Sequence, residues 1–91
     1  AIRRDIAVLV DLEVSAGKVT ECVREAAPET LRELELFDVY TGEGVDSGRK
    51  SLALGLTLQA HSRTLKDSEI EQAVADIVTA LQKNLGATLR E

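Results

Sequence analysis

Every second residue from Leu52 to Leu58 is a leucine, and this feature does most to limit the folds open to the chain. The residues between the leucines, Ala53, Gly55 and Thr57, are small or polar. A two-residue repeat places successive side chains on opposite faces of a β-strand, whereas a helix would scatter the leucines around its axis. The pattern predicts a strand with one face buried in a hydrophobic core and the other thin and partly polar.

Hydrophobic spacing in the rest of the chain predicts two helices and three more strands. Apolar residues recur every three or four positions in two segments, the first capped by Ser15 and ended near Pro28, the second ended by Gly86. Ser68 and Glu71 have the spacing of a capping box at the start of the second helix. The predicted strands are residues 6–12, 34–40, 51–59 and 87–90, and the predicted helices are residues 15–28 and 68–85.

The order of these elements predicts the fold class. Strand, helix, strand, strand, helix, strand is the βαββαβ order of an α+β, ferredoxin-like fold, with a four-stranded antiparallel sheet and two helices on one of its faces. The glycine-rich loop at residues 41–48 is predicted to connect the two middle strands as a hairpin. No internal repeat or linker divides the chain, so we expect one domain over residues 1–91.

The alternation also predicts which side chains lie on the sheet face that the helices leave open. Phe37 and Val39 are predicted to face the helices together with the leucines. The opposite face is small and polar around one aromatic residue, Tyr40, and such a surface suits a flat ligand such as a base or a peptide edge. The alternative, which stays open here, is that another domain of a longer protein covers this face. The predicted open-face residues are Ala7, Leu9, Asp11, Leu36, Asp38, Tyr40, Ser51, Ala53, Gly55 and Thr57.

The composition excludes several classes of function. Cys22 is the only cysteine and His61 the only histidine, so the sequence supports no disulfide, no thiolate metal site and no nucleophile–base pair. The net charge of −5 has the wrong sign for a protein that holds nucleic acid by bulk electrostatics alone. The longest apolar run, Ile6–Val10, is too short to span a bilayer, and we expect a cytoplasmic protein. The chain has no methionine and begins with Ala1, which suggests a piece of a longer polypeptide.

Five residue strings carry a resemblance to a known family. They are Arg-Arg-Asp-Ile-Ala at 3–7, Leu-Phe-Asp-Val-Tyr-Thr-Gly-Glu-Gly-Val at 36–45, Gly-Arg-Lys-Ser-Leu-Ala at 48–53, Leu-Thr-Leu-Gln at 56–59 and Arg-Thr-Leu-Lys-Asp at 63–67. In this order and spacing the chain resembles the ferredoxin-fold anticodon-binding (FDX-ACB) domain found at the C-terminus of bacterial phenylalanyl-tRNA synthetase beta subunits. The resemblance covers essentially all 91 residues.

The resemblance implies that the open sheet face binds the anticodon of phenylalanine tRNA. Tyr40 would stack on the first anticodon base, and Ala7 would let that base lie close to the backbone. Asp38 and Ser51 would hydrogen-bond to the base, and a carboxylate that accepts from the N1–H and amino group of guanine would favour guanine over adenine. Four basic residues outside the predicted helices are possible contacts to the RNA backbone: Arg3, Arg4, Arg49 and Lys50.

The resemblance also implies a supporting, non-catalytic role. The family's enzyme attaches phenylalanine to its tRNA with ATP and magnesium as an alpha–beta heterotetramer, and its catalytic centre lies on the alpha subunit. We therefore expect no catalytic residue, cofactor or metal in this domain, and we expect tRNA(Phe), the alpha subunit and other domains of the beta subunit as partners. The sequence departs from the family pattern at Leu54, Gly55 and His61, and the missing side chain at Gly55 predicts the loss of a phosphate or sugar contact.

Two other functions are compatible with the same fold. An ACT-like module that binds a small regulatory ligand would use the loop after the first strand, where Gly17 is the only suggestive residue. An acylphosphatase-like hydrolase would need an arginine phosphate cradle after that strand and an asparagine on the sheet. The only asparagine is Asn84, late in the second predicted helix. The ACT-like module is therefore the stronger alternative.

Overall fold

The computed structural model describes residues 1–60 and 63–90. It has the six predicted elements in the predicted order, and this confirms the ferredoxin-like α+β fold. His61 lies outside the described residues. The elements are β1 (Ile2–Asp11), α1 (Ala16–Ala26), β2 (Leu31–Tyr40), β3 (Arg49–Leu58), α2 (Asp67–Leu85) and β4 (Thr88–Leu89).

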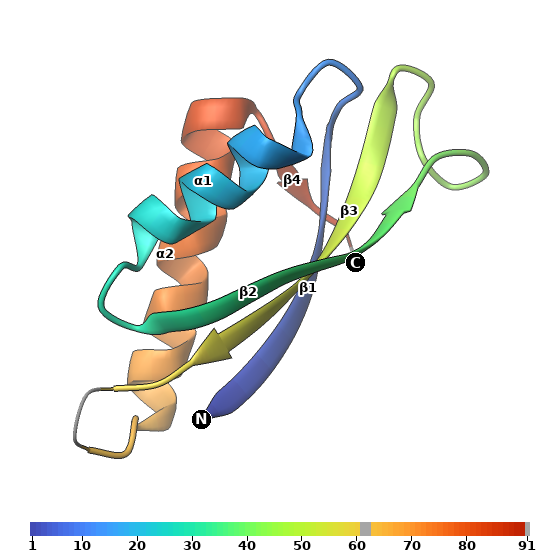
Figure 1. The fold of residues 1–91 in the computed structure, drawn as a ribbon. Coiled ribbons are helices and arrows are strands. Elements are labelled where there is room, and N and C mark those ends of the chain that lie inside the picture. Colours follow the sequence, from blue (N-terminus) through green and yellow to red (C-terminus); the bar gives the residue numbers. More distant parts are fainter. Residues whose placement is uncertain (61–62, 91) are drawn as a thin grey trace.

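The four strands form one sheet in the order β2-β3-β1-β4, and every neighbouring pair is antiparallel. Both helices cover the same face of this sheet, as Figure 1 shows, and they leave the other face open. β3 and β1 lie in the middle, so the strand with the leucine repeat has hydrogen-bonded neighbours on both sides. β2 and β4 form the edges.

The core lies between the sheet and the two helices. All four leucines from Leu52 to Leu58 have no exposed surface, as the alternation predicts. They pack with Val8 and Val10 of β1 and with aliphatic residues of both helices, among them Val19 and Ile77. Removal of this aliphatic surface from water is the main force that holds the helices on the sheet.

The helix ends confirm two predicted signals and correct one. Ser15 caps α1, because its Oγ accepts a hydrogen bond from the backbone N–H of Lys18 at 3.1 Å. Gly86 ends α2 in the left-handed conformation, with φ of 64°. The Ser68–Glu71 capping box is wrong, because α2 begins at Asp67 and the backbone N–H of its cap residue, Lys66, donates to the Glu69 carboxylate at 3.1 Å.

A β-bulge in β2 overturns the predicted faces of two residues. Leu36 pairs with Leu54, whereas Asp38 pairs with Ala53, the next residue of β3, so Phe37 is one extra residue on the β2 side. Leu36, predicted on the open face, therefore lies on the helix side and packs against the core. Phe37, predicted to face the helices, is 49% exposed and lies beside Arg3 on the open face. A uniform two-residue period cannot reveal an inserted residue.

Candidate nucleic-acid interface

The open face is built from cross-strand rows of side chains. Residues paired across antiparallel strands lie on the same side of a sheet, so the register defines each row. One row runs Tyr40, Ser51, Leu9 and Thr88 across all four strands. The next row runs Asp38, Ala53 and Ala7, and the backbone N–H of Arg90 extends it by donating to the carbonyl of Ala7 at 2.7 Å.

These two adjacent rows contain all four residues predicted to read a base. Tyr40 and Asp38 come from β2, Ser51 from β3 and Ala7 from β1. The short side chains of Ala7 and Ala53 form a thin floor between the polar residues of β2 and the β4 edge. The rows thus place an aromatic ring, a carboxylate and the hydroxyl of Ser51, which is only 4% exposed, around a floor of two short side chains.

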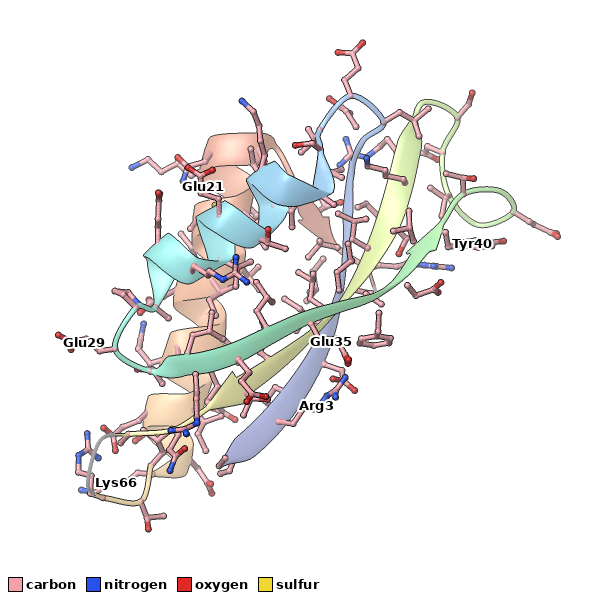
Figure 2. The ribbon with its side chains drawn as sticks, in the orientation of Figure 1. Arg3, Glu21, Glu29, Glu35, Tyr40 and Lys66 are labelled. Carbon is pink, nitrogen blue, oxygen red and sulfur yellow. The ribbon has the colours of Figure 1, made fainter. Side chains whose placement is uncertain are left out.

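The position of Tyr40 is set by the hairpin loop that follows it. The Tyr40 hydroxyl donates to the backbone carbonyl of Glu43 at 2.8 Å, and 37% of the residue stays exposed. Gly42 has a φ of 128°, which L residues rarely adopt, and a Cβ there would come within 3.5 Å of the Tyr40 Oη. The loop therefore packs against the hydroxyl end of the Tyr40 ring. Figure 2 shows Tyr40 beside this loop.

Sequence reasoning missed one residue of this site, Arg90. Its guanidinium carbon lies 5.3 Å from the centroid of the Tyr40 ring, within cation–π range. Arg90 follows the short β4 at the far edge of the sheet, so its side chain reaches toward Tyr40 over the two-alanine floor. The register could have revealed it: an antiparallel last strand puts Arg90 opposite Ala7.

The four basic residues predicted to contact an RNA backbone fall into two groups. Arg4 pairs with Leu56 and Lys50 pairs with Val10, so both lie on the helix side of the sheet. Arg49 lies on the open side, where it donates to the Asp11 carboxylate at 3.1 Å and to the carbonyls of two other residues, Leu9 at 2.8 Å and Gly86 at 3.3 Å. These contacts tie the end of α2 to the sheet.

Arg3, the fourth basic residue, also has internal partners. Its guanidinium donates to the carboxylates of Asp5 at 2.9 Å and Glu35 at 3.0 Å. These two hydrogen bonds raise the pKa of Arg3 above its ordinary value. The guanidinium also lies over Gly55, so the predicted gap at that glycine is filled by a side chain from β1.

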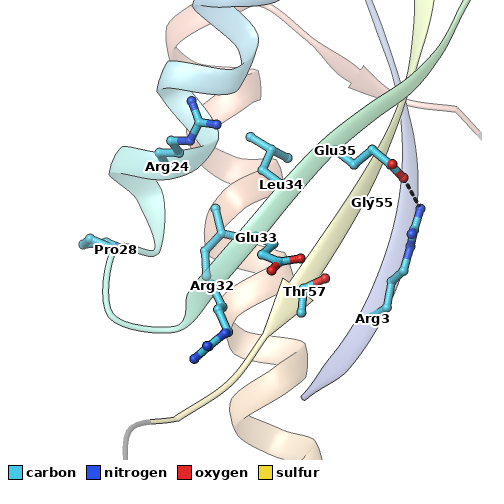
Figure 3. Close-up of a pocket in the computed structure, with 10 residues that line it drawn as sticks. Arg3, Arg24, Pro28, Arg32, Glu33, Leu34, Glu35, Gly55 and Thr57 are labelled. Atoms are coloured by element: carbon cyan, nitrogen blue, oxygen red, sulfur yellow. Dashed lines mark hydrogen bonds and ion pairs between the residues drawn. The ribbon is translucent and has the colours of Figure 1, made fainter.

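A polar hollow of about 710 Å³ lies at the outer edge of β2 (Figure 3). Its walls come from the C-terminal end of α1, from both sides of β2 and from the open face of β1 and β3, and they include Arg24, Arg32, Arg3 and Gly55. Tyr40, Asp38 and the other two predicted base-reading residues do not line it. The hollow wraps around an edge strand, whereas the predicted site lies flat on the sheet.

The remaining observations concern a metal site, a membrane span, the single cysteine and Gly17. In residues 1–60 and 63–90, no group of three or more His, Cys, Asp or Glu side chains is placed to hold a metal ion, and no helix is long and apolar enough to cross a membrane. Cys22 is buried in α1. Gly17, the residue that the ACT-like alternative depends on, lies in the first turn of α1.

The amino-acid sequence matches a known protein family and several known proteins. Residues 1–90 match the family described as ferredoxin-fold anticodon binding domain. The phenylalanine–tRNA ligase beta subunit of Pseudomonas fluorescens Pf-5 is 51% identical over 90 residues, which is 99% of this chain and 11% of that subunit. The beta subunit of Vibrio vulnificus is 50% identical over 91 residues, covering 100% of this chain and 11% of that subunit. The chain thus spans about a tenth of the length of these relatives.

Proposed function

The chain belongs to the ferredoxin-fold anticodon-binding domain family, and from this premise we propose that it binds the anticodon of phenylalanine tRNA on its open sheet face. One observation carries the proposal: Tyr40, Asp38, Ser51 and Ala7, from three strands, lie in two adjacent rows of that face. Sequence-specific RNA recognition mostly targets unpaired bases, which are stacked on aromatic rings and read along their polar edges. These two rows offer the groups that such recognition needs.

Each residue has a distinct part in the proposed readout. The Tyr40 ring stacks on the first anticodon base, and the alanine floor lets the base approach the sheet. The Asp38 carboxylate accepts from the N1–H and amino group of guanine, a donor pair that adenine lacks. The Ser51 hydroxyl adds a hydrogen bond that fixes the orientation of the base.

Two side chains must move before a base can bind in this way. The Arg90 guanidinium covers one face of the Tyr40 ring, so a base can stack on that face only after Arg90 is displaced. Ser51 is only 4% exposed, and a ligand reaches its hydroxyl only after a neighbouring side chain shifts. Both movements cost binding free energy, and we expect weak binding by the domain alone.

The charges of the domain also predict weak RNA binding. The net charge is −5, and two of the four candidate backbone contacts, Arg3 and Arg49, are already bonded to carboxylates. Few cations are left to release counterions from RNA, so the salt dependence of binding should be shallow. The domain then supplies base readout, and other parts of a longer protein hold the rest of the tRNA.

The longer protein that we propose is a phenylalanine–tRNA ligase beta subunit. It would act in the cytoplasm with an alpha subunit, as a heterotetramer that uses ATP and magnesium to join phenylalanine to its tRNA. The support is about 50% identity to such subunits over nearly the whole chain. Within that assembly this domain would check the anticodon and would take no part in bond formation.

The proposal is tested by NMR titration of the chain with an anticodon stem-loop of phenylalanine tRNA at low salt. Guanine at the first anticodon position should shift amides of β1, β2 and β3, and adenine there should bind more weakly. Tyr40→Ala should weaken binding by about five- to a hundredfold, as expected for one lost stack. Tyr40→Phe keeps the ring, removes the hydrogen bond to Glu43 and serves as the matched control.

Asp38→Asn tests the specificity step. An amide offers a donor as well as an acceptor, so this variant should bind guanine and adenine stem-loops with similar affinity. The readout is wrong if the shifted amides avoid β1 to β3, or if the unmodified chain gives the same shifts with either base.

A further inference from the structure

Both aromatic residues of this chain lie on the open face of the sheet, and neither belongs to the core. Phe37 is 49% exposed and Tyr40 is 37% exposed. Aromatic side chains carry the largest apolar surfaces that a protein can bury, and burying them stabilises a fold strongly. In a chain with one phenylalanine and one tyrosine, leaving both rings half in water needs an explanation. Tyr40 has one in the proposed base readout, and Phe37 does not.

The β-bulge in β2 puts the Phe37 side chain on the open face. Leu36 keeps its place on the helix side opposite Leu54, and Asp38 keeps its place on the open face opposite Ala53. The extra residue between them therefore adds a ring to the open face without moving its neighbours. Bulges often re-aim a side chain in this way. Phe37 and Tyr40 are three residues apart on the same edge strand, so their Cα atoms are separated by roughly 10 Å or less.

Arg3 completes the surroundings of the Phe37 ring. Its guanidinium carbon lies 5.4 Å from the ring centroid. The carboxylates of Asp5 and Glu35 hold the group there, and Gly55 makes room for it, since a Cβ at that position would lie 2.7 Å from the Arg3 Cζ. A planar guanidinium fixed on two carboxylates is pre-organised, which lowers the entropy cost of stacking against it.

We propose that Phe37 and Arg3 form a second stacking site, which takes an unpaired RNA base next to the base on Tyr40. This inference rests on the proposed function. Aromatic rings and arginine guanidinium planes are the two surfaces on which splayed RNA bases stack, and both are present here. The two carboxylates around Arg3 disfavour a phosphate at this spot and can accept hydrogen bonds from a base. The occupant is therefore a base.

The test is a cycle between a protein change and an RNA change. The probe is the anticodon stem-loop, intact or with an abasic nucleotide on either side of the first anticodon base. With the intact stem-loop, Phe37→Ala should weaken binding about five- to a hundredfold. If the missing base is the one that stacks on Phe37, Phe37→Ala should have almost no further effect on binding. The coupling identifies which neighbouring base stacks on Phe37.

Two further variants keep the result specific. Val39→Ala removes an apolar side chain that is 53% exposed on the same strand but pairs with Leu52, on the other side, so it should leave RNA affinity unchanged. Phe37→Trp keeps a ring and should bind at least as well as the unmodified chain. Equal losses for Phe37→Ala with the intact and both abasic stem-loops would overturn the second site. So would a loss for Val39→Ala as large as that for Phe37→Ala.

The design separates failure of this site from failure of the proposed function. If the unmodified chain does not bind the stem-loop, or binds it without regard to the first base and to Tyr40, both proposals are wrong. If binding depends on Tyr40 and Asp38 but shows no coupling to Phe37, only the second site is wrong.

Discussion

The two faces of β3 show how one strand meets two different demands. On the helix side, the four leucines from Leu52 to Leu58 have no exposed surface and fill the space between sheet and helices. On the open side, Ala53 and Thr57 are half-buried, and Gly55 is covered only because Arg3 lies over it. On the helix side, the residues are large because they must fill the core. On the open side, they are small because other side chains or a ligand must lie flat against the sheet.

The largest effect is expected on the leucine side. Leu56→Ala should lower the free energy of unfolding by about 2–5 kcal/mol, because it leaves a cavity in a core with no exposed surface at that residue. Thr57→Ala, on the neighbouring open-side position, should cost less than about 1 kcal/mol. Urea unfolding followed by far-UV circular dichroism measures both. Similar costs for the two variants would contradict the division between the faces.

A smaller effect on the free energy of unfolding is expected for Gly55→Ala, and its sign should depend on whether Arg3 is present. In the unmodified chain Gly55→Ala pushes the Arg3 guanidinium off its carboxylates, so it should destabilise or give no gain. In a chain that already carries Arg3→Ala, the space is empty, and the same substitution should stabilise by about 0.4–1 kcal/mol, since alanine restricts the unfolded chain. A double-mutant cycle by urea unfolding checks this. Stabilisation in both backgrounds would show that Arg3 does not occupy the space over Gly55.

The smallest effect concerns a charge outside β3, in the first turn of α2. Arg63 donates to the Glu69 carboxylate at 2.6 Å, and this contact, with the backbone N–H of Lys66, lowers the pKa of Glu69 to about 2. The depressed pKa favours the folded state above the ordinary value of 4.5, and the contribution is lost as pH falls toward about 2. Glu69→Gln should therefore destabilise slightly at pH 7 and by less at pH 2.5.

Urea unfolding at the two pH values checks the prediction for Glu69, and Glu71→Gln is a suitable control on the same helix. Glu69→Gln keeps an oxygen that can accept from the Lys66 N–H, so the comparison isolates the charge. A Glu69→Gln effect that is the same at both pH values would mean that the ion pair with Arg63 does not form in solution.

Most of the fold could be predicted from the sequence, because apolar periodicity directly reports which side chains are buried. The strand at residues 51–59 and the stripe of α2 were evident for that reason. β1 and β2 begin earlier than predicted, at Ile2 and Leu31. Most of their first residues are charged, so these segments show no apolar alternation. Strand pairing with β3 extends them, and pairing is a tertiary effect.

The candidate site was predictable in part. The face of Tyr40, Asp38, Ser51 and Ala7 followed from alternation, and their roles stay predictions drawn from the family resemblance. Leu36 and Phe37 were placed on the wrong faces because nothing local marks a bulge. Arg90 and Arg3 were missed as ring partners because each reaches its ring across the sheet, over alanines in one case and a glycine in the other.

The bulge at Phe37 has a consequence for how related chains can differ in length. If this one residue were deleted, Leu36 and Asp38 would become neighbours, and they already lie on opposite sides of the sheet, as neighbours in a regular strand must. Pairing of β2 with β3 would become regular from Glu33 to Tyr40, and every remaining side chain in that stretch would keep its side. Chains with and without this residue would share one fold and one core, and the deletion would remove a single ring from the open surface.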